Sequence, residues 1–271
     1  RRPGGGSRGL EEGVGERVGE HHSILYGPIN ALLIRLLGEP PVEKLSPGLA
    51  AFFFPDGKHA WIPDAAIMTL LLLAIFAVFF PWMARRYSRE KPGKLQSFFE
   101  MLVSGLRGLV NDSIEEGAHR KYLPIIGSFA IFIASANLFG LFFFLQPPTG
   151  SLSTTVALAL ISFVYFNWQG IKEQGLGKYL GHFAGPLLAI APLFFVIEII
   201  GTFARILSLS LRLFMNIYGE HTTTGVFASL VPIVVPWPMM ALGIFTAFLQ
   251  AYVFALLSAV YVQGATAHEA H

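Results

Sequence analysis

Three charged side chains inside one apolar segment are the residues of this chain best placed to do chemistry. Glu198, Arg205 and Arg212 follow one another at intervals of seven residues in FFVIEIIGTFARILSLSLRLFMNIYGEH. Seven steps of about 100° return to within about 20° of the starting direction, so the three side chains share one face of a helix. Ser208 and Asn216, four residues before and four after Arg212, extend this face into a polar stripe. A charge near the centre of a bilayer costs at least about 2.5–3.5 kcal/mol, so such a stripe in a membrane segment is expected to face protein or water.

A second group of polar residues lies close to this stripe. Glu220 and His221 end the same segment, and histidine titrates near neutral pH, which suits a proton relay. In the last apolar run, Thr246 and Gln250 stand four residues apart and Ser258 follows them. Gln250 could orient a guanidinium on the neighbouring helix without neutralising it, and ordinary hydrogen bonding between helices is the alternative for all three residues.

The simplest alternative for the arginines is that they extend to the lipid headgroups. Arg212 lies seven residues before Gly219, where the apolar segment gives way to polar residues. Long basic side chains near the end of a helix can reach the membrane interface. A helix that faces lipid gains nothing, however, from Glu198, Ser208 and Asn216 on the arginine side. The polar stripe therefore favours contact with protein or with a water-filled path.

Composition excludes a water-soluble enzyme. Of the 271 residues, 54% are hydrophobic and only 13% are charged, whereas a soluble domain is typically about 25% charged. The sequence has no cysteine, which excludes disulfides, thiolate nucleophiles and cysteine-based metal sites. It also lacks a GxxxxGK(S/T) phosphate loop, and HEAH at residues 268–271 has the wrong spacing for a zinc helix. We therefore expect no metal and no cofactor, and the net charge of +2 is too small to indicate nucleic acid as a partner.

The apolar sequence is divided into runs that predict an all-α multi-pass membrane protein with five to six membrane helices. A run of about 20 residues crosses the hydrocarbon core as a helix, because that core is about 30 Å thick. The fourth run has 33 residues and would be roughly 50 Å long as one helix, so we expect it to be steeply tilted or broken. The last run has the same excess length. The five runs are residues 65–82, 122–145, 151–166, 186–218 and 226–262, of which the second and third predict a helical hairpin around the turn at 146–150.

The rest of the chain is expected to lie at the membrane surface or outside it. Residues 24–37 form an amphipathic patch that is too short to span, which predicts an interfacial helix. Residues 85–121 are basic and amphipathic and predict a surface helix. We divide the chain into a polar N-terminal region (1–63), a membrane domain (64–263) and a C-terminal tail (264–271).

Orientation follows from the basic residues. Eight of the 19 lysines and arginines lie between residues 85 and 121, and Lys172 and Lys178 follow in the next loop on that side. The positive-inside rule makes these loops cytoplasmic. Five crossings then place the N-terminus outside and the C-terminus in the cytoplasm.

Several of these segments, taken in order, are similar to one family. SLSLRLFMNIYGE (208–220) resembles the signature segment of subunit a of F-type ATP synthases, usually of the form LRLFGN. GIFTAFLQAYVFALLSAVYV (243–262) resembles the last helix of that family. Support comes from NLFGL (137–141), from PPTGSLSTTVALAL (147–160) and from Pro92 with Gln96 and Glu100. Helix packing and capping are the alternative explanation for Asn137. The likeness runs from about residue 64 to residue 262.

The resemblance implies a non-catalytic stator subunit of the bacterial inner membrane that forms two half-channels, so that proton flow drives rotation of a ring of c subunits. The implied partners are the c-ring, the peripheral-stalk b subunits, the rest of the ATP synthase and the lipid bilayer. Arg212 matches the essential arginine of the family, Asn216 the asparagine after it, and Gln250 the glutamine of the last helix. We expect the residues of ion translocation to be Arg212, Glu198, Asn216, Glu220, His221, Gln250, Arg205 and Ser208.

The sequence departs from the family pattern at two places. Met215 stands where glycine is usual. The family also has a pair of polar residues, one on each of the last two helices, and this pair is altered here. His221 stands where many members have Glu or His, and Glu220 lies beside it. The partner position on the last helix is Gly243.

Two readings from other classes are also consistent with the residues. An independent secondary transporter or ion channel would use Glu198, Arg205 and Arg212 as an ion site and would transport as an isolated chain, although the sequence has no detectable repeat. An intramembrane enzyme would use Glu220 and His221 as an acid–base or metal pair, but no second cluster of His and Asp accompanies them in the membrane segments.

Overall fold

The computed structural model describes residues 23–37, 62–88, 92–114, 119–142, 145–175, 177, 179, 191–230 and 236–266. In chain order the elements are α2 (Tyr26–Leu37), α4 (Asp64–Arg85), α5 (Lys94–Ser113), α6 (His119–Phe139), the 3-10 turn η2 (Pro148–Gly150), α7 (Leu152–Gln174), α9 (Ala191–Leu230) and α10 (Pro236–Thr266). Within these ranges, five helices are long and apolar enough to cross a membrane: α4, α6, α7, α9 and α10. The predicted all-α multi-pass class is therefore confirmed.

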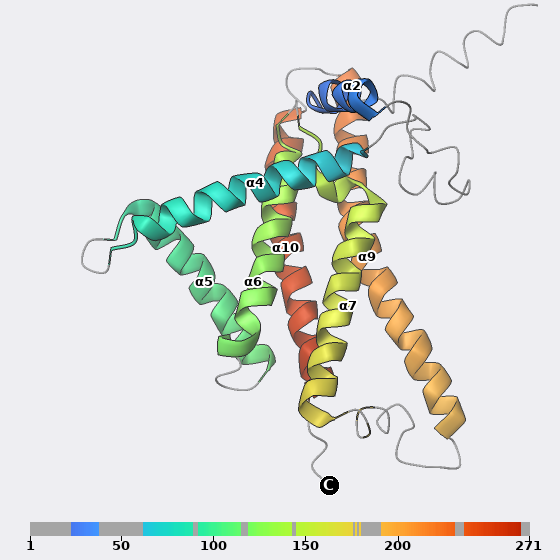
Figure 1. Cartoon of the computed structure of the whole chain (residues 1–271). Coiled ribbons are helices and arrows are strands. Elements are labelled where there is room, and N and C mark those ends of the chain that lie inside the picture. The colour runs from blue at the N-terminus through green and yellow to red at the C-terminus, as the bar shows by residue number, and fades with distance from the viewer. Residues whose placement is uncertain are drawn as a thin grey trace, which may run out of the picture.

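Helix α10 is the centre of the bundle (Figure 1) and contacts α5, α6, α7 and α9. One of its faces carries only methyl side chains, because Ala247, Ala251, Ala255 and Ala259 recur every four residues and all four are buried. Small residues at this spacing allow neighbouring helices to approach closely. The alanine face thus lets one helix pack against several others at the same level.

Helix α9 is longer than the sequence predicted. The apolar run ends near Tyr218, but the helix continues without a break through the polar residues that follow and ends at Leu230. Polar residues weaken a helix much less than proline does, and the next prolines come only at positions 232 and 236. Forty residues at about 1.5 Å each make a helix of roughly 60 Å. Figure 1 shows that α9 leans away from the other helices toward its N-terminal end.

The hairpin predicted around residues 146–150 is confirmed, with shifted boundaries. Helix α6 ends at Phe139, and α7 runs eight residues past the predicted end, to Gln174. Gly175 then adopts φ +79°, the left-handed backbone that commonly ends a helix and that glycine adopts most easily. In the turn, the hydroxyl of Thr149 donates a hydrogen bond of 2.6 Å to Oδ1 of Asn137, so η2 is fixed to the end of α6.

Helices α4 and α5 form an arm beside the bundle. Helix α4 lies across the upper ends of α6 and α7, and α5 returns obliquely toward the lower end of α6 (Figure 1). Gln96 of α5 fixes the segment that follows α4. Its side chain accepts a hydrogen bond from the backbone N–H of Ser88 (3.1 Å) and donates one to the backbone carbonyl of Ser88 (2.8 Å). Leu106, Leu109 and Val110 of α5 are buried against α6 and α10, so the second half of the predicted surface helix packs on the bundle.

Helix α2 is attached to the start of α4 by polar contacts. Both the backbone N–H and the hydroxyl of Ser23 donate to the carboxylate of Asp64, the former at 2.8 Å. Asn30 exchanges two hydrogen bonds of 3.2 Å with the backbone of Ile62. The helix predicted at residues 24–37 is confirmed as a helix, and its position at a membrane interface remains a prediction.

Candidate functional site

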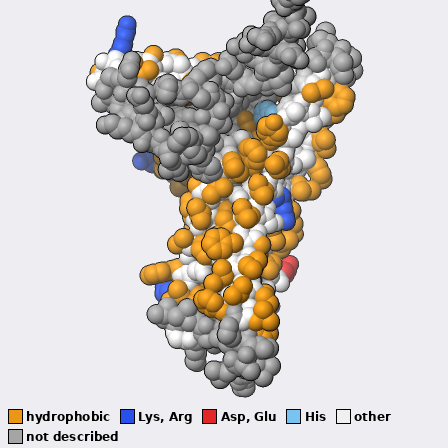
Figure 2. Space-filling view, turned by 90° about the vertical axis from the view of Figure 1, so that its right-hand side faces the viewer, with side chains coloured by type: hydrophobic (Ala, Val, Ile, Leu, Met, Phe, Trp, Pro, Cys, Tyr) orange, Lys and Arg blue, Asp and Glu red, His pale blue; other side chains and the backbone are white. Residues whose placement is uncertain are grey.

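Arg212 lies on the outside of the bundle, near the middle of α9. The residues that attach this part of α9 to the core are Leu209, Leu213 and Ile217, which are at most 3% exposed. Arg212 is exposed on another face of the helix, with Met215 exposed beside it. On the face drawn in Figure 2, most of the coloured side chains are hydrophobic and the few charged ones are isolated from one another. In the described part of the chain, Arg212 has no acidic partner and no hydrogen bond.

Helix α9 continues past Gly219, so Arg212 lies far from both ends of the helix. From Arg212 to the end of α9 at Leu230 there are 18 residues, which is about 27 Å along the helix axis. Ser208, predicted to share its face, is exposed like Arg212.

Glu198 and Arg205 form an ion pair, with Nη2 of Arg205 3.2 Å from Oε1 of Glu198. The guanidinium carbon of Arg205 also lies 5.7 Å from the ring centroid of Tyr261 on α10, which is within the range of a cation–π contact. The two residues line a cavity of about 310 Å³ between α7, α9 and α10. Arg205 therefore has its charge compensated by Glu198, whereas Arg212 has no acidic partner among the residues that the structure describes.

On the other side of Arg212, Glu220 reaches across to α10. Its Oε2 is 3.4 Å from the hydroxyl of Thr246, whose single hydrogen has the carbonyl of Gly243 as a second acceptor at 3.1 Å. A Cβ placed on Gly243 would lie only 1.9 Å from Oε1 of Glu220. The glycine at this position therefore provides the space that the carboxylate occupies.

Two more polar groups lie near this end of α9. Nε2 of His221 would be 3.0 Å from a Cβ placed on Gly140, so the histidine lies against the end of α6. Asn137, predicted to serve packing and capping, is 4% exposed, and its Nδ2 is a buried donor without a hydrogen-bond partner among the described residues. Nδ2 of Asn216 is likewise a buried donor without a hydrogen-bond partner among the described residues. These two amides offer free N–H donors beside α9.

The remaining candidates are distributed as follows. Gln250 is 6% exposed, but no hydrogen bond joins it to Arg212 in the part of the chain that the structure describes, so its orienting role remains a prediction. Ser258 is buried and bonds to Ser162 of α7 at 3.1 Å, which matches the ordinary helix-packing alternative. Sequence reasoning missed Asn167 and Tyr179, which line the cavity of Glu198, because the predicted third run stopped at residue 166.

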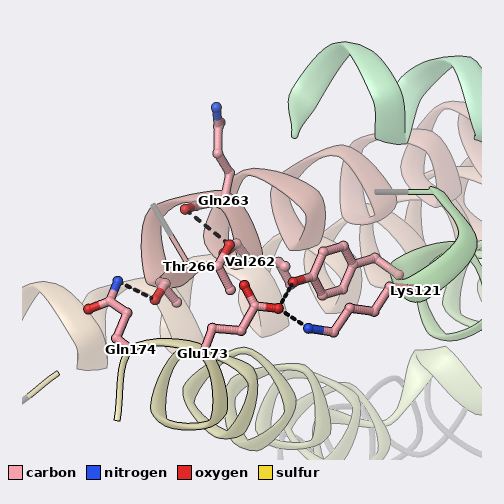
Figure 3. A network of polar contacts seen from close by, with 8 residues as sticks. Lys121, Glu173, Gln174, Val262, Gln263 and Thr266 are labelled. Atoms are coloured by element: carbon pink, nitrogen blue, oxygen red, sulfur yellow. Dashed lines mark hydrogen bonds and ion pairs between the residues drawn. The ribbon is translucent and has the colours of Figure 1, made fainter. Parts of the chain in front are cut away.

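A polar network joins α6, α7 and α10 at the end of the bundle where this cavity lies (Figure 3). Glu173 accepts a hydrogen bond of 2.7 Å from the hydroxyl of Tyr122 and forms an ion pair with Lys121. The side chain of Gln174 donates to the carbonyl of Ala265 at 3.1 Å, near the end of α10. The C-terminal end of α7 is thereby fixed to two other helices.

A bundle in which five helices are long and apolar enough to cross a membrane defines a class, the multi-pass membrane proteins. Comparison with known proteins is more specific. The family described as ATP synthase A chain matches residues 66–263. The chain belongs to this family.

Three bacterial proteins illustrate the similarity, each called ATP synthase subunit a. That of Geotalea daltonii is 42% identical over 202 residues, covering 74% of this chain and 86% of the relative. That of Sulfurihydrogenibium sp. is 39% identical over 205 residues, covering 76% and 98%. That of Campylobacter jejuni is 41% identical over 200 residues, covering 73% and 88%.

Proposed function

We propose that this chain is the ion-translocating stator subunit of an F-type ATP synthase, without catalytic activity of its own, and that it forms two half-channels beside a rotating c-ring. The observation that carries the proposal is the position of Arg212. It is a permanent cation, exposed on the outside of the bundle, far from both ends of α9 and without an acidic partner among the described residues. Such a group is costly in a membrane unless a neighbouring protein supplies the opposite charge.

The chemistry of arginine suits this role. A guanidinium is not deprotonated in proteins and is therefore a permanent cation. It attracts a passing rotor carboxylate and keeps that carboxylate ionised. A lysine would be able to lose its proton in a desolvated site, and arginine would not. Arg212 is therefore suited to release the proton from each arriving carboxylate and to block a direct leak between the half-channels.

The two polar regions of α9 supply the two paths. The Glu198–Arg205 cavity begins 14 residues before Arg212, about 21 Å along the helix. Glu220 lies eight residues after it, about 12 Å in the other direction. Protons would reach the rotor through the Glu220 region, with His221, Asn137 and Asn216 nearby, and leave past Glu198. The separation of the two regions by Arg212, which has no acidic partner in the described part of the chain, supports offset half-channels.

Orientation and partners complete the proposal. The loops rich in lysine and arginine face the cytoplasm, which places the Glu198 cavity on the cytoplasmic side and the N-terminus outside. The exposed apolar side chains around Arg212 would contact the c-ring, and the peripheral-stalk b subunits would hold this chain to the rest of the ATP synthase.

Replacing Arg212 tests the proposal. The whole complex carrying Arg212→Ala or Arg212→Lys, in inverted membrane vesicles, is expected to lose ATP synthesis more than about 100-fold, because an unreleased proton stops the ring. Arg107→Ala is the matched control, since Arg107 is an exposed arginine on α5 and away from both polar regions. Synthesis by Arg212→Ala at a substantial fraction of the control rate would refute the proposal. Ion transport by the isolated, reconstituted chain would instead favour an independent transporter.

A further inference from the structure

The cavity of Glu198 has a second polar wall, which comes from α7 and from the segment after it. Tyr179 follows the end of α7 by five residues and is only 7% exposed. Its ring returns against α7 at Gly170, where an added Cβ would lie 2.6 Å from Cε2 of Tyr179 and 2.8 Å from the backbone carbonyl of Ala265 on α10. The absence of a side chain at position 170 therefore makes room for the ring and for the backbone of α10 at once.

The hydroxyl of Tyr179 is held in a fixed direction. It donates a hydrogen bond of 2.6 Å to Oδ1 of Asn167, and Nδ2 of Asn167 in turn donates 2.7 Å to the carbonyl of Phe163. The amide is therefore oriented from both ends. Burial raises the pKa of Tyr179 above its ordinary value. The charge of Arg205 opposes this rise, and the charge of Glu198 reinforces it. The hydroxyl therefore keeps its proton at neutral pH and remains a donor.

The wall across the cavity is the Glu198–Arg205 ion pair. A cavity of about 310 Å³, at about 30 Å³ per molecule of liquid water, has room for roughly ten waters. Waters there would find charged partners on the α9 side and hydrogen-bonding partners on the α7 side. The network of Lys121, Glu173 and Gln174 holds the same end of α7, so the α7 wall is anchored rather than free to follow α9.

We propose that Tyr179 and Asn167 are positioning residues of the ion path, which keep the cavity beside Glu198 open and hydrated. The inference rests on the proposed function for the identity of the ion path. The ring of Tyr179 closes the seam between α7 and α10, and the oriented amide makes this wall polar. Without the hydroxyl, this wall loses an oxygen that can accept a hydrogen bond from water, and the amide of Asn167 loses the contact that fixes its direction.

The experiment uses the absence of cysteine from this chain. Thr202 lines the cavity, so Thr202→Cys is a reporter for its hydration in the intact complex, in vesicles with the cytoplasmic face outward. The probe is a small, membrane-impermeant methanethiosulfonate reagent, and the readout is its rate of reaction with the cysteine. Thr222→Cys, exposed near the other end of α9, is the reporter for a general disturbance and is measured in vesicles with the opposite face outward.

Tyr179→Phe is expected to slow modification of Thr202→Cys about fivefold, the factor given by loss of one ordinary hydrogen bond, and to leave Thr222→Cys unchanged. Asn167→Leu should have the same effect, and the double variant should be no slower than either single variant, because the two residues act through one contact. Tyr87→Phe, the same change at a residue that is 57% exposed just after the end of α4, should change neither rate.

Unchanged modification of Thr202→Cys in Tyr179→Phe would overturn the inference, and so would equal slowing of both reporters, which would indicate a general disturbance. Arg212→Ala, measured in parallel, separates this outcome from failure of the proposed function. If Arg212→Ala abolishes ATP-driven pumping while Tyr179→Phe leaves the reporter unchanged, only the role of Tyr179 and Asn167 is refuted. If Arg212→Ala still pumps, the proposed function fails whatever the reporter shows.

Discussion

The space that Gly243 leaves for Glu220 gives a sharp prediction about the path on that side of Arg212. In Gly243→Ala the new Cβ would lie 1.9 Å from Oε1 of Glu220, and ordinary contact begins at 3.4 Å, so the carboxylate must move by about 1.5 Å. Its contact with the hydroxyl of Thr246 is already long, at 3.4 Å, and would break. A hydrogen bond of this kind contributes about 1 kcal/mol, and about 1.4 kcal/mol corresponds to a tenfold change in rate. We therefore expect roughly fivefold slower proton conduction.

The assay is passive proton conduction through vesicles that contain the membrane part of the complex, followed with a pH-sensitive dye. Gly219→Ala is the matched control, because a Cβ on Gly219 meets nothing within 4 Å. Adding Glu220→Asp to Gly243→Ala should recover part of the rate, since the shorter side chain withdraws from the methyl group. If Gly243→Ala conducts as well as Gly219→Ala, the carboxylate does not act from the position described, and the reasoning fails.

Two further predictions concern the other end of the bundle. Gly170→Ala should destabilise the complex by about 1–3 kcal/mol through overpacking, because the added Cβ would lie 2.8 Å from the backbone of α10, which is unable to yield as a flexible side chain would. The measurement is the temperature at which this subunit is released from the purified complex. Gly177→Ala is the control, because a Cβ at position 177 meets nothing within 4 Å. Glu198→Gln should lower the amount of this chain in membranes, because it leaves Arg205 unpaired, and adding Arg205→Ala should restore that amount, as measured by immunoblot. Equal levels in the single and double variants would contradict the importance of the ion pair.

The sequence predicts the helices well where apolar runs and prolines define them. The heptad spacing of Glu198, Arg205 and Arg212 also predicts their common helix correctly. It does not predict where α9 ends, because the polar residues 219–225 are weak rather than strong helix breakers. The direction of α4 is equally hidden, since an apolar run fixes the length of a helix and not its angle to its neighbours.

The candidate site was predictable in its charged residues and not in its walls. Glycines at positions 140, 170 and 243 each face a polar side chain or an aromatic ring from another part of the chain. No local pattern marks such a glycine, because its function depends on which residue arrives across the interface. Tyr179 is the clearest example, since its contact with Gly170 requires the chain to reverse after Gly175.

The two arginines of the stripe show why spacing alone does not decide chemistry. Seven residues apart on one helix, Arg205 and Arg212 differ in what the neighbouring elements supply. Arg205 faces the cavity, where Glu198 and Tyr261 compensate its charge. Arg212 lies beyond the cavity, where α9 presents its outer surface and no acidic partner is present among the described residues. A charge that the fold itself compensates stays with one partner, whereas a charge without a partner can pair with each group that arrives. Only the second property suits the role proposed for Arg212 beside a rotor carboxylate.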